Sequence, residues 1–250
     1  MTDPVPESKR RRRSRRETEE LMLQAGVELA LDQRTGITVG ADPLPSIRVA
    51  DVVERATEIV RRTDAAAPAI TTGSIYPIWP DQSGFQAALL VHLLESDHLG
   101  IAPEWNELAD YLENTTDDVH TVVASLARIG WDHGRANQRL LIVLSQGINL
   151  PIEHREAFAA HYDRVWEQLV PAFQLIANRF GYQLRPGRAH IDFVRTAVAT
   201  LDGLIVQNQA DSAGLDERDH LAREHDGDGW TLVGQATAAL FDGWFELAPS

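Results

Sequence analysis

The chain has 250 residues and carries 23 Lys and Arg against 37 Asp and Glu, for a net charge of −14, with no cysteine. The lack of cysteine excludes disulfides, thiolate metal sites and a cysteine nucleophile. No apolar run approaches the ~20 residues that cross a bilayer, and no hydrophobic stretch follows the basic residues near the N-terminus. We therefore expect a cytoplasmic protein without a membrane partner.

The charge is distributed unevenly along the chain. Residues 1–80 hold 12 Lys and Arg and 12 Asp and Glu, whereas residues 81–250 hold 11 and 25 and so carry the whole net charge. Residues 1–16 are polar and rich in bases, so we interpret them as a flexible arm that binds DNA phosphates or, alternatively, as a solvated tail. The bases of this arm are Lys9, Arg10, Arg11, Arg12, Arg13, Arg15 and Arg16.

Two helices and a short compact element are predicted between residues 17 and 80. Acidic residues and an apolar face predict a first helix over residues 17–36. After a Gly- and Pro-rich segment, Ser46 can cap a second helix, whose apolar residues keep helical spacing to about Arg62. Residues 64–68 break this helix, and residues 71–80 form the compact element between two breakers.

Beyond residue 80 the apolar residues recur at spacings of three and four, and no segment is typical of a strand. Pro151 fits a helix first turn, and a long face runs from Phe158 to Phe180 before Gly181, with a kink expected at Pro171. Residues 211–228 are predicted to form a charged loop. The predicted fold class is therefore all-α, with further apolar faces starting at Phe85, Trp105, Val119, Ile191 and Val233.

Several segments resemble the tetracycline-repressor (TetR) family. Thr71-Thr72-Gly73-Ser74-Ile75-Tyr76, followed by Trp79 and Phe85, resembles the family's recognition helix and the entry to its next helix. Residues 23–36 are similar to its first helix, and residues 181–203 to its penultimate, dimerisation helix. The resemblance implies an N-terminal three-helix helix-turn-helix DNA-binding domain at residues 17–80, then a larger helical ligand-binding and dimerisation domain at 81–250.

As a member of that family, the chain would be a transcription regulator, in the simplest case a repressor released by a small-molecule effector. Its partners would be an inverted-repeat DNA operator and a second copy of itself, with no cofactor, no metal and no enzymatic activity. We expect the dimer to form through the alanine-rich helices from Ile191 to Gln207 and from Trp230 to Glu246. Burial of these helices inside one chain is the alternative.

The resemblance and the geometry of the major groove predict the residues that bind DNA. Hydroxyl groups can donate to bases or phosphates, a glycine allows close backbone approach, and a basic residue at the start of the second helix can reach the DNA backbone. Trp79 is expected to pack in the core instead. The predicted DNA-binding residues are Arg10, Arg11, Arg12, Arg13, Arg15, Arg16, Arg48, Thr71, Thr72, Gly73, Ser74 and Tyr76.

Four departures from the family pattern fall in the DNA-binding half. Residues 36–48 and 56–71 are longer than the corresponding family segments, Gln82 replaces a phosphate-directed lysine, and Pro77 shortens the recognition helix. These departures leave open a second interpretation, in which a TetR-like helical module binds a ligand or a protein without reading DNA.

Effector-binding residues are expected in an apolar pocket of the second domain. The candidates, each of which could instead be a core or surface residue, are Trp105, Tyr111, His120, Trp131, Trp166 and Phe173. A helical-bundle di-iron enzyme is a remote alternative, suggested by Glu95-x-x-His98 and Glu217-x-x-His220. Chance accounts for both pairs, and Glu217 lies in the predicted charged loop.

Overall fold

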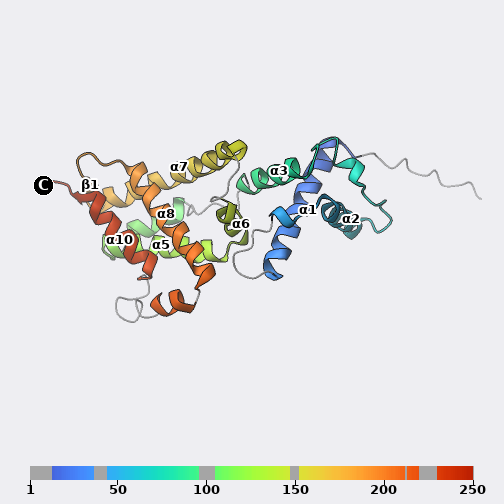
Figure 1. The fold of residues 1–250 in the computed structure, drawn as a ribbon. Helices are drawn as coiled ribbons and strands as arrows, with labels where there is room; N and C mark the ends of the chain where they lie inside the picture. Colours follow the sequence, from blue (N-terminus) through green and yellow to red (C-terminus); the bar gives the residue numbers. More distant parts are fainter. Residues whose placement is uncertain are drawn as a thin grey trace, which may run out of the picture. The chain divides into compact units, whose positions relative to one another are not determined.

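A computed structural model describes residues 13–36, 44–95, 105–146, 152–211, 213–219 and 230–249. Most of these residues are helical, which confirms the predicted all-α class (Figure 1). The chain forms two compact units, one of residues 1–35 and 43–90 and the other of residues 36–42 and 91–250. This division falls within helix α3 (Gln82–Leu94), ten residues after the boundary predicted from the sequence.

The first unit contains α1 (Arg15–Gly36), α2 (Val49–Thr63) and the start of α3. Short 3-10 turns lie at η1 (Leu44–Ser46) and η2 (Thr72–Ser74). The predicted Ser46 cap is wrong, because Ser46 belongs to η1 and Arg48 is the N-cap residue of α2, without a side-chain cap hydrogen bond.

A capping box explains why α1 begins where it does. The backbone N–H of Glu17 donates to Ser14 Oγ at 3.1 Å, and the N–H of Ser14 donates to Glu17 Oε2 at 2.6 Å. Farther along, α1 meets α3 at Gly26, where an added Cβ would lie 3.0 Å from both Phe85 and Leu89 side chains. Glycine therefore permits the close approach of these two helices.

The second unit is built mainly on α5, α7, α8 and α10, which lie together in Figure 1. Asp118 accepts from the Thr121 N–H at the start of α5, and Thr231 accepts from the Gly234 N–H at the start of α10. The elements of this unit are α4 (Trp105–Asn114), α5 (Val119–Ala136), α6 (Gln138–Gln146), η4 (Ile152–His154), α7 (Arg155–Arg179), β1 (Tyr182–Leu184), α8 (His190–Ala210), α10 (Leu232–Trp244) and β2 (Phe245–Leu247).

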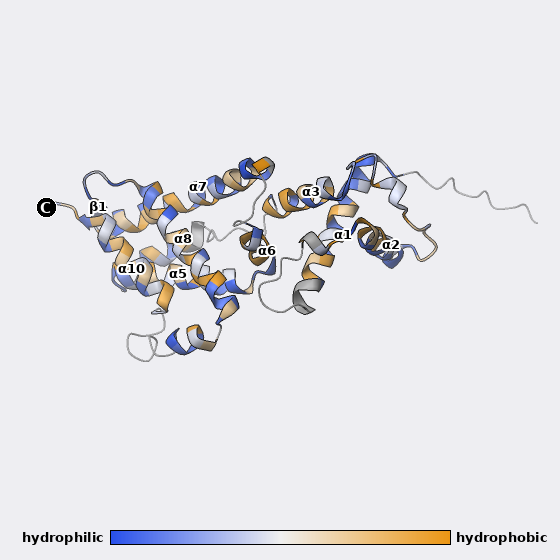
Figure 2. Cartoon of the chain, viewed as in Figure 1, coloured by the Kyte–Doolittle hydropathy of each residue, from blue (hydrophilic) through white to orange (hydrophobic). Residues whose placement is uncertain are grey.

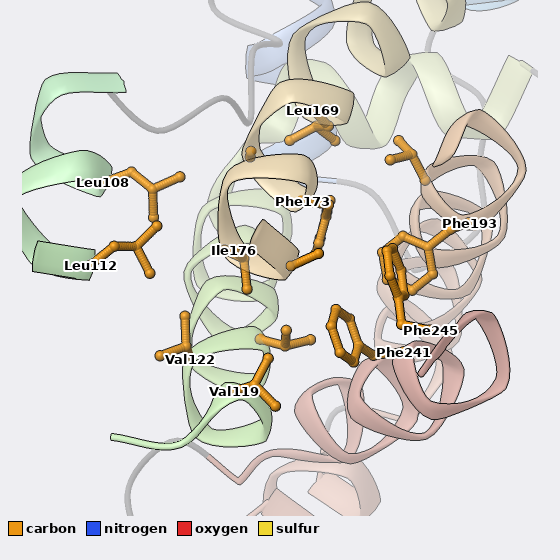
Figure 3. Close-up of a cluster of buried hydrophobic side chains, with 14 of the residues drawn as sticks. Leu108, Leu112, Val119, Val122, Leu169, Phe173, Ile176, Phe193, Phe241 and Phe245 are labelled. Atoms are coloured by element: carbon orange, nitrogen blue, oxygen red, sulfur yellow. The ribbon is translucent and has the colours of Figure 1, made fainter. Parts of the chain in front are cut away.

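Aromatic side chains fill the centre of the second unit (Figure 3). Phe241 and Phe245 stack with ring centroids 4.3 Å apart, and Phe193 meets Phe173 edge-on at 4.8 Å. Aliphatic side chains of α4, α5, α7 and α8 complete this cluster. The helices that carry it have hydrophilic residues on their other faces (Figure 2), so periodic apolar spacing identifies them correctly.

Three features differ from the sequence-based expectation. Strands β1 and β2 form an antiparallel pair with Leu184 opposite Phe245, so the prediction that no strand follows residue 80 is wrong. The sequence pattern does not predict helix α6, because its buried residues 140–143 are consecutive and show no helical period. Residues 213–219 are helical within the predicted charged loop, whose residues 212 and 220–228 lie outside the described part of the chain, as does Pro151.

Pro171 lies inside α7, which runs without interruption from Arg155 to Arg179. No helix in the described part of the chain combines the length and the apolar character that a membrane span requires.

Candidate nucleic-acid interface

A cleft in the first unit brings together predicted DNA-binding residues from two distant parts of the sequence. We call it the α1–η2 cleft. It has a volume of about 760 Å³ and lies between the start of α1 and residues 64–78. The predicted DNA-binding residues that line it are Arg13, Arg15, Thr71, Gly73 and Ser74.

The element corresponding to the predicted recognition helix is a 3-10 turn rather than an α-helix. The N–H of Ser74 donates to the Thr71 carbonyl at 2.9 Å, and the N–H of Ile75 donates to the Thr72 carbonyl at 3.0 Å. Pro77 has no N–H and disfavours the helical conformation of the residue before it, so a regular helix cannot extend through this segment.

Two buried side chains hold the turn against the rest of the first unit. Ile75 is fully buried, and Trp79 is 7% exposed and meets Phe85 edge-on at 5.1 Å. The expectation that Trp79 packs in the core is therefore confirmed. Thr71 and Thr72 are exposed on the other side of the turn, which leaves their hydroxyls accessible.

Helix α2 positions the segment that leads into η2. The Thr57 hydroxyl, which is buried, accepts from the Ile70 N–H at 2.9 Å and donates to the Val53 carbonyl at 2.9 Å. Arg61 Nε donates to the Ala67 carbonyl at 3.3 Å. Sequence reasoning missed Thr57, because a threonine inside an amphipathic helix gives no sign of a partner 13 residues away.

The basic residues of the first unit fall into paired and unpaired groups. Arg55 contacts Asp32 at 2.7 Å and Glu28 at 3.4 Å, and Arg62 contacts Glu28 at 3.1 Å. The hydrogen bond and the charge of Asp32 raise the pKa of Arg55. These two arginines link α2 to α1, and their charges are already paired with acidic side chains within the fold.

Other arginines of the first unit are exposed. Arg13, Arg15 and Arg48 form none of the ion pairs found among the described residues, whereas Arg16 contacts Glu20 at 2.7 Å. Arg48 does not line the α1–η2 cleft, although it stands at the uncapped N-terminus of α2. Arg10, Arg11 and Arg12 lie outside the described residues.

The remaining predicted DNA-contacting residues also lie outside the cleft lining. Thr72 is exposed on η2, and the Tyr76 side chain is 55% exposed just after it. Gln82, which stands where the family pattern has a lysine and was not predicted to contact DNA, is the exposed first residue of α3. The cleft thus unites five of the twelve predicted residues.

The candidate effector-binding residues do not share one cavity in the second unit. Trp166 lines an open pocket of about 690 Å³ between α7 and α8, which we call the α7–α8 pocket. Phe173 lines an internal cavity of only about 50 Å³. A drug-sized ligand needs roughly 300 Å³ or more, so of these two only the α7–α8 pocket is large enough.

Four of the six candidates lie elsewhere. The Tyr111 hydroxyl donates to Asp117 at 3.0 Å, and burial raises the pKa of Tyr111. His120 Nε2 is 2.7 Å from Asp242 Oδ1. Trp131 is buried in the core, and the side chain of Trp105 lies outside the described part of the structure.

Sequence reasoning missed the polar groups of the α7–α8 pocket. The Tyr162 hydroxyl donates to Asp202 Oδ2 at 2.7 Å. Burial raises the pKa of Asp202 to about 6, while the hydrogen bond from Tyr162 opposes this shift. Arg195 lies over the Trp166 ring, with its guanidinium carbon 4.3 Å from the ring centroid. No spacing rule links Tyr162 to an aspartate 40 residues away.

Within the described residues, no group of three or more His, Asp and Glu side chains is placed to hold a metal ion. Both di-iron motifs include a histidine, His98 or His220, that lies outside these residues.

Comparison with solved structures finds a similarity that extends over most of the chain. No protein-family model matches the sequence, and neither does any curated protein. Among solved structures, the chain is similar to SmeT, the repressor of the Stenotrophomonas maltophilia multidrug efflux pump SmeDEF, with a TM-score of 0.46 and 15% sequence identity. The alignment covers 91% of this chain and 90% of that chain.

Proposed function

We propose that the chain is a TetR-like transcription regulator whose first unit binds DNA and whose homodimer recognises an inverted-repeat operator. The observation that carries this proposal is the α1–η2 cleft. It places two exposed arginines, Arg13 and Arg15, beside the polar groups of Thr71, Gly73 and Ser74.

The chemistry of this cleft suits a nucleic acid. Arginines without a protein partner can neutralise phosphates and release counterions, while hydroxyl and backbone N–H groups can reach base edges or phosphate oxygens. The N-terminus of α2 adds a second phosphate-directed feature, because its first N–H groups have no side-chain cap and Arg48 stands beside them.

Small exposed residues in the second unit support the dimerisation part of the proposal. Gly203 on α8 and Gly243 on α10 are exposed, and a Cβ added at either would meet nothing within 4 Å. Ala239 on α10 is exposed as well, so both helices offer small residues that allow a second copy to approach closely. In the simplest scheme, a small molecule bound in the second unit releases the dimer from its operator.

Selection from random DNA followed by quantitative binding tests the proposal. The variant Thr71→Ala/Thr72→Ala/Ser74→Ala should lower the preference for operator over random DNA by about 1–3 kcal/mol for each well-formed hydrogen bond to a base that it removes, with little change in salt dependence. Thr63→Ala, which removes an exposed hydroxyl at the end of α2, is the matched control. Mass measurement of the wild-type complex should give two chains per operator.

The arginines should behave differently from the hydroxyl residues. Replacing Arg13 and Arg15 by glutamine keeps the Ser14 cap of α1 and should weaken binding to operator and random DNA alike. The slope of log K against log salt should become shallower by about 0.9 for each phosphate that is no longer neutralised. If no DNA is selected at low salt, or the triple variant keeps its sequence preference, the alternative of a ligand- or protein-binding module replaces this proposal.

A further inference from the structure

We infer that the α7–α8 pocket binds a small organic cation, an apolar amine whose ammonium group pairs with the Asp202 carboxylate. This inference names the kind of ligand for the sensing part of the proposed function. Only an effect of the ligand on DNA binding rests on that proposed function. The site itself is argued from the second unit alone.

The shape and lining of the pocket suit an apolar ligand body. Its volume of about 690 Å³ lies within the range of small-molecule sites. Phe158, Tyr162 and Trp166 form an aromatic row along α7, with successive ring centroids 5.1 and 5.8 Å apart. Val198 of α8 lines the same pocket, so the walls are mainly apolar and aromatic.

Asp202 supplies the polar anchor. Its carboxylate is partly buried, and its hydrogen bond from Tyr162 is a single one, whereas a carboxylate has about four acceptor positions. Asp202 makes no ion pair with any basic side chain of the described residues. A carboxylate withdrawn from water without a cation is costly, and an ammonium ligand would supply both the charge and the missing donors.

The acidity of Asp202 agrees with this assignment. Burial raises the pKa of Asp202 to about 6, so the carboxylate is still largely ionised at pH 7.5 and can attract a cation there. At pH 5 it is mostly protonated. Binding of a permanently protonated amine should therefore weaken as the pH falls through 6.

Two arginines also line the pocket, but they favour an anion only weakly. Arg155 and Arg195 are exposed, so water screens their charges. Arg195 is moreover stacked on Trp166. The less hydrated charge, that of Asp202, is therefore expected to decide which ligand binds.

Three probes of similar shape but different charge test whether Asp202 or the arginines select the ligand. They are 4-phenylbutylammonium, 4-phenylbutanol and 4-phenylbutanoate. Calorimetric titration of the full-length chain at pH 7.5 should show the ammonium binding at least about tenfold more tightly than the alcohol, a factor that one charge-assisted hydrogen bond can supply. Its affinity should fall about tenfold between pH 7.5 and pH 5 as Asp202 is protonated, whereas that of the alcohol should stay constant.

Substitution of the anchor completes the test. Asp202→Asn should bind the alcohol as the wild type does, which verifies the pocket, and should lose both the preference for the ammonium and its pH dependence. Asp163→Asn, at an exposed position on α7 outside the pocket lining, should keep both. Failure of the ammonium to bind, tightest binding of 4-phenylbutanoate, or an unchanged preference in Asp202→Asn would overturn the inference.

Operator binding measured with and without 4-phenylbutylammonium distinguishes the two proposals. If the amine binds but operator affinity is unchanged, the pocket assignment stands and release by this ligand is wrong. If the wild type binds its operator but not the amine, the pocket assignment is wrong and the DNA-binding proposal stands.

Discussion

The two units hold their candidate functional groups in different ways. In the first unit, the residues that would read DNA lie on a 3-10 turn, which is tied to α2 through Thr57 and anchored by Ile75 and Trp79. In the second unit, the α7–α8 pocket is lined by long helices that also carry the aromatic core. The turn at Thr72–Ser74 therefore depends on a few local contacts, whereas the pocket rests on packing distributed over several helices.

The largest effect expected from this contrast comes from the aromatic core. Phe241 is fully buried and stacks on Phe245, so Phe241→Ala should lower the free energy of unfolding of the second unit by about 3–5 kcal/mol. Urea unfolding followed by circular dichroism measures this decrease. Leu247→Ala, at a side chain that is 67% exposed, should change stability by less than about 0.5 kcal/mol. A decrease below about 1 kcal/mol for Phe241→Ala would argue against a distributed framework.

A smaller and more local effect is expected at Thr57. Thr57→Val keeps the side-chain shape but removes the acceptor of the Ile70 N–H, which should cost about 1–3 kcal/mol. Hydrogen exchange should become faster in residues 64–74, while the centres of α1 and α2 keep their protection. Thr63→Val, at an exposed position of the same helix, is the control. Uniformly faster exchange across the first unit would show that Thr57 supports the whole unit rather than this segment.

The smallest effect concerns Asp202 and depends on pH. Because its pKa is raised from 3.8 to about 6 in the fold, its contribution to stability is fully present below pH 3.8 and is lost as the pH rises through about 6. Asp202→Asn should therefore be more stable than the wild type at pH 8, by about 1 kcal/mol after allowance for partial exposure, and the difference should diminish toward pH 4. Melting temperatures at the two pH values measure it, and Asp163→Asn should show no such trend. An equal difference at both pH values would contradict burial as the cause.

Sequence periodicity determined the helices of both units, because helical hydrogen bonds and an apolar face are local properties. The predicted apolar faces that begin at Phe85, Val119 and Ile191 lie on the observed helices α3, α5 and α8. The basic residues near the N-terminus and the polar residues 71–74 are also recognisable in the sequence, and both contribute to the α1–η2 cleft.

Tertiary structure alone decided the features that depend on distant partners. Pairing of β1 with β2 joins residues more than 60 positions apart, and α1 brings Arg13 and Arg15 to the turn at Thr71. The sequence likewise does not predict the raised pKa of Asp202, because burial between α7 and α8 and the hydroxyl of Tyr162 set this pKa. Desolvation and through-space contacts arise only when the helices pack, so local sequence patterns do not encode them separately.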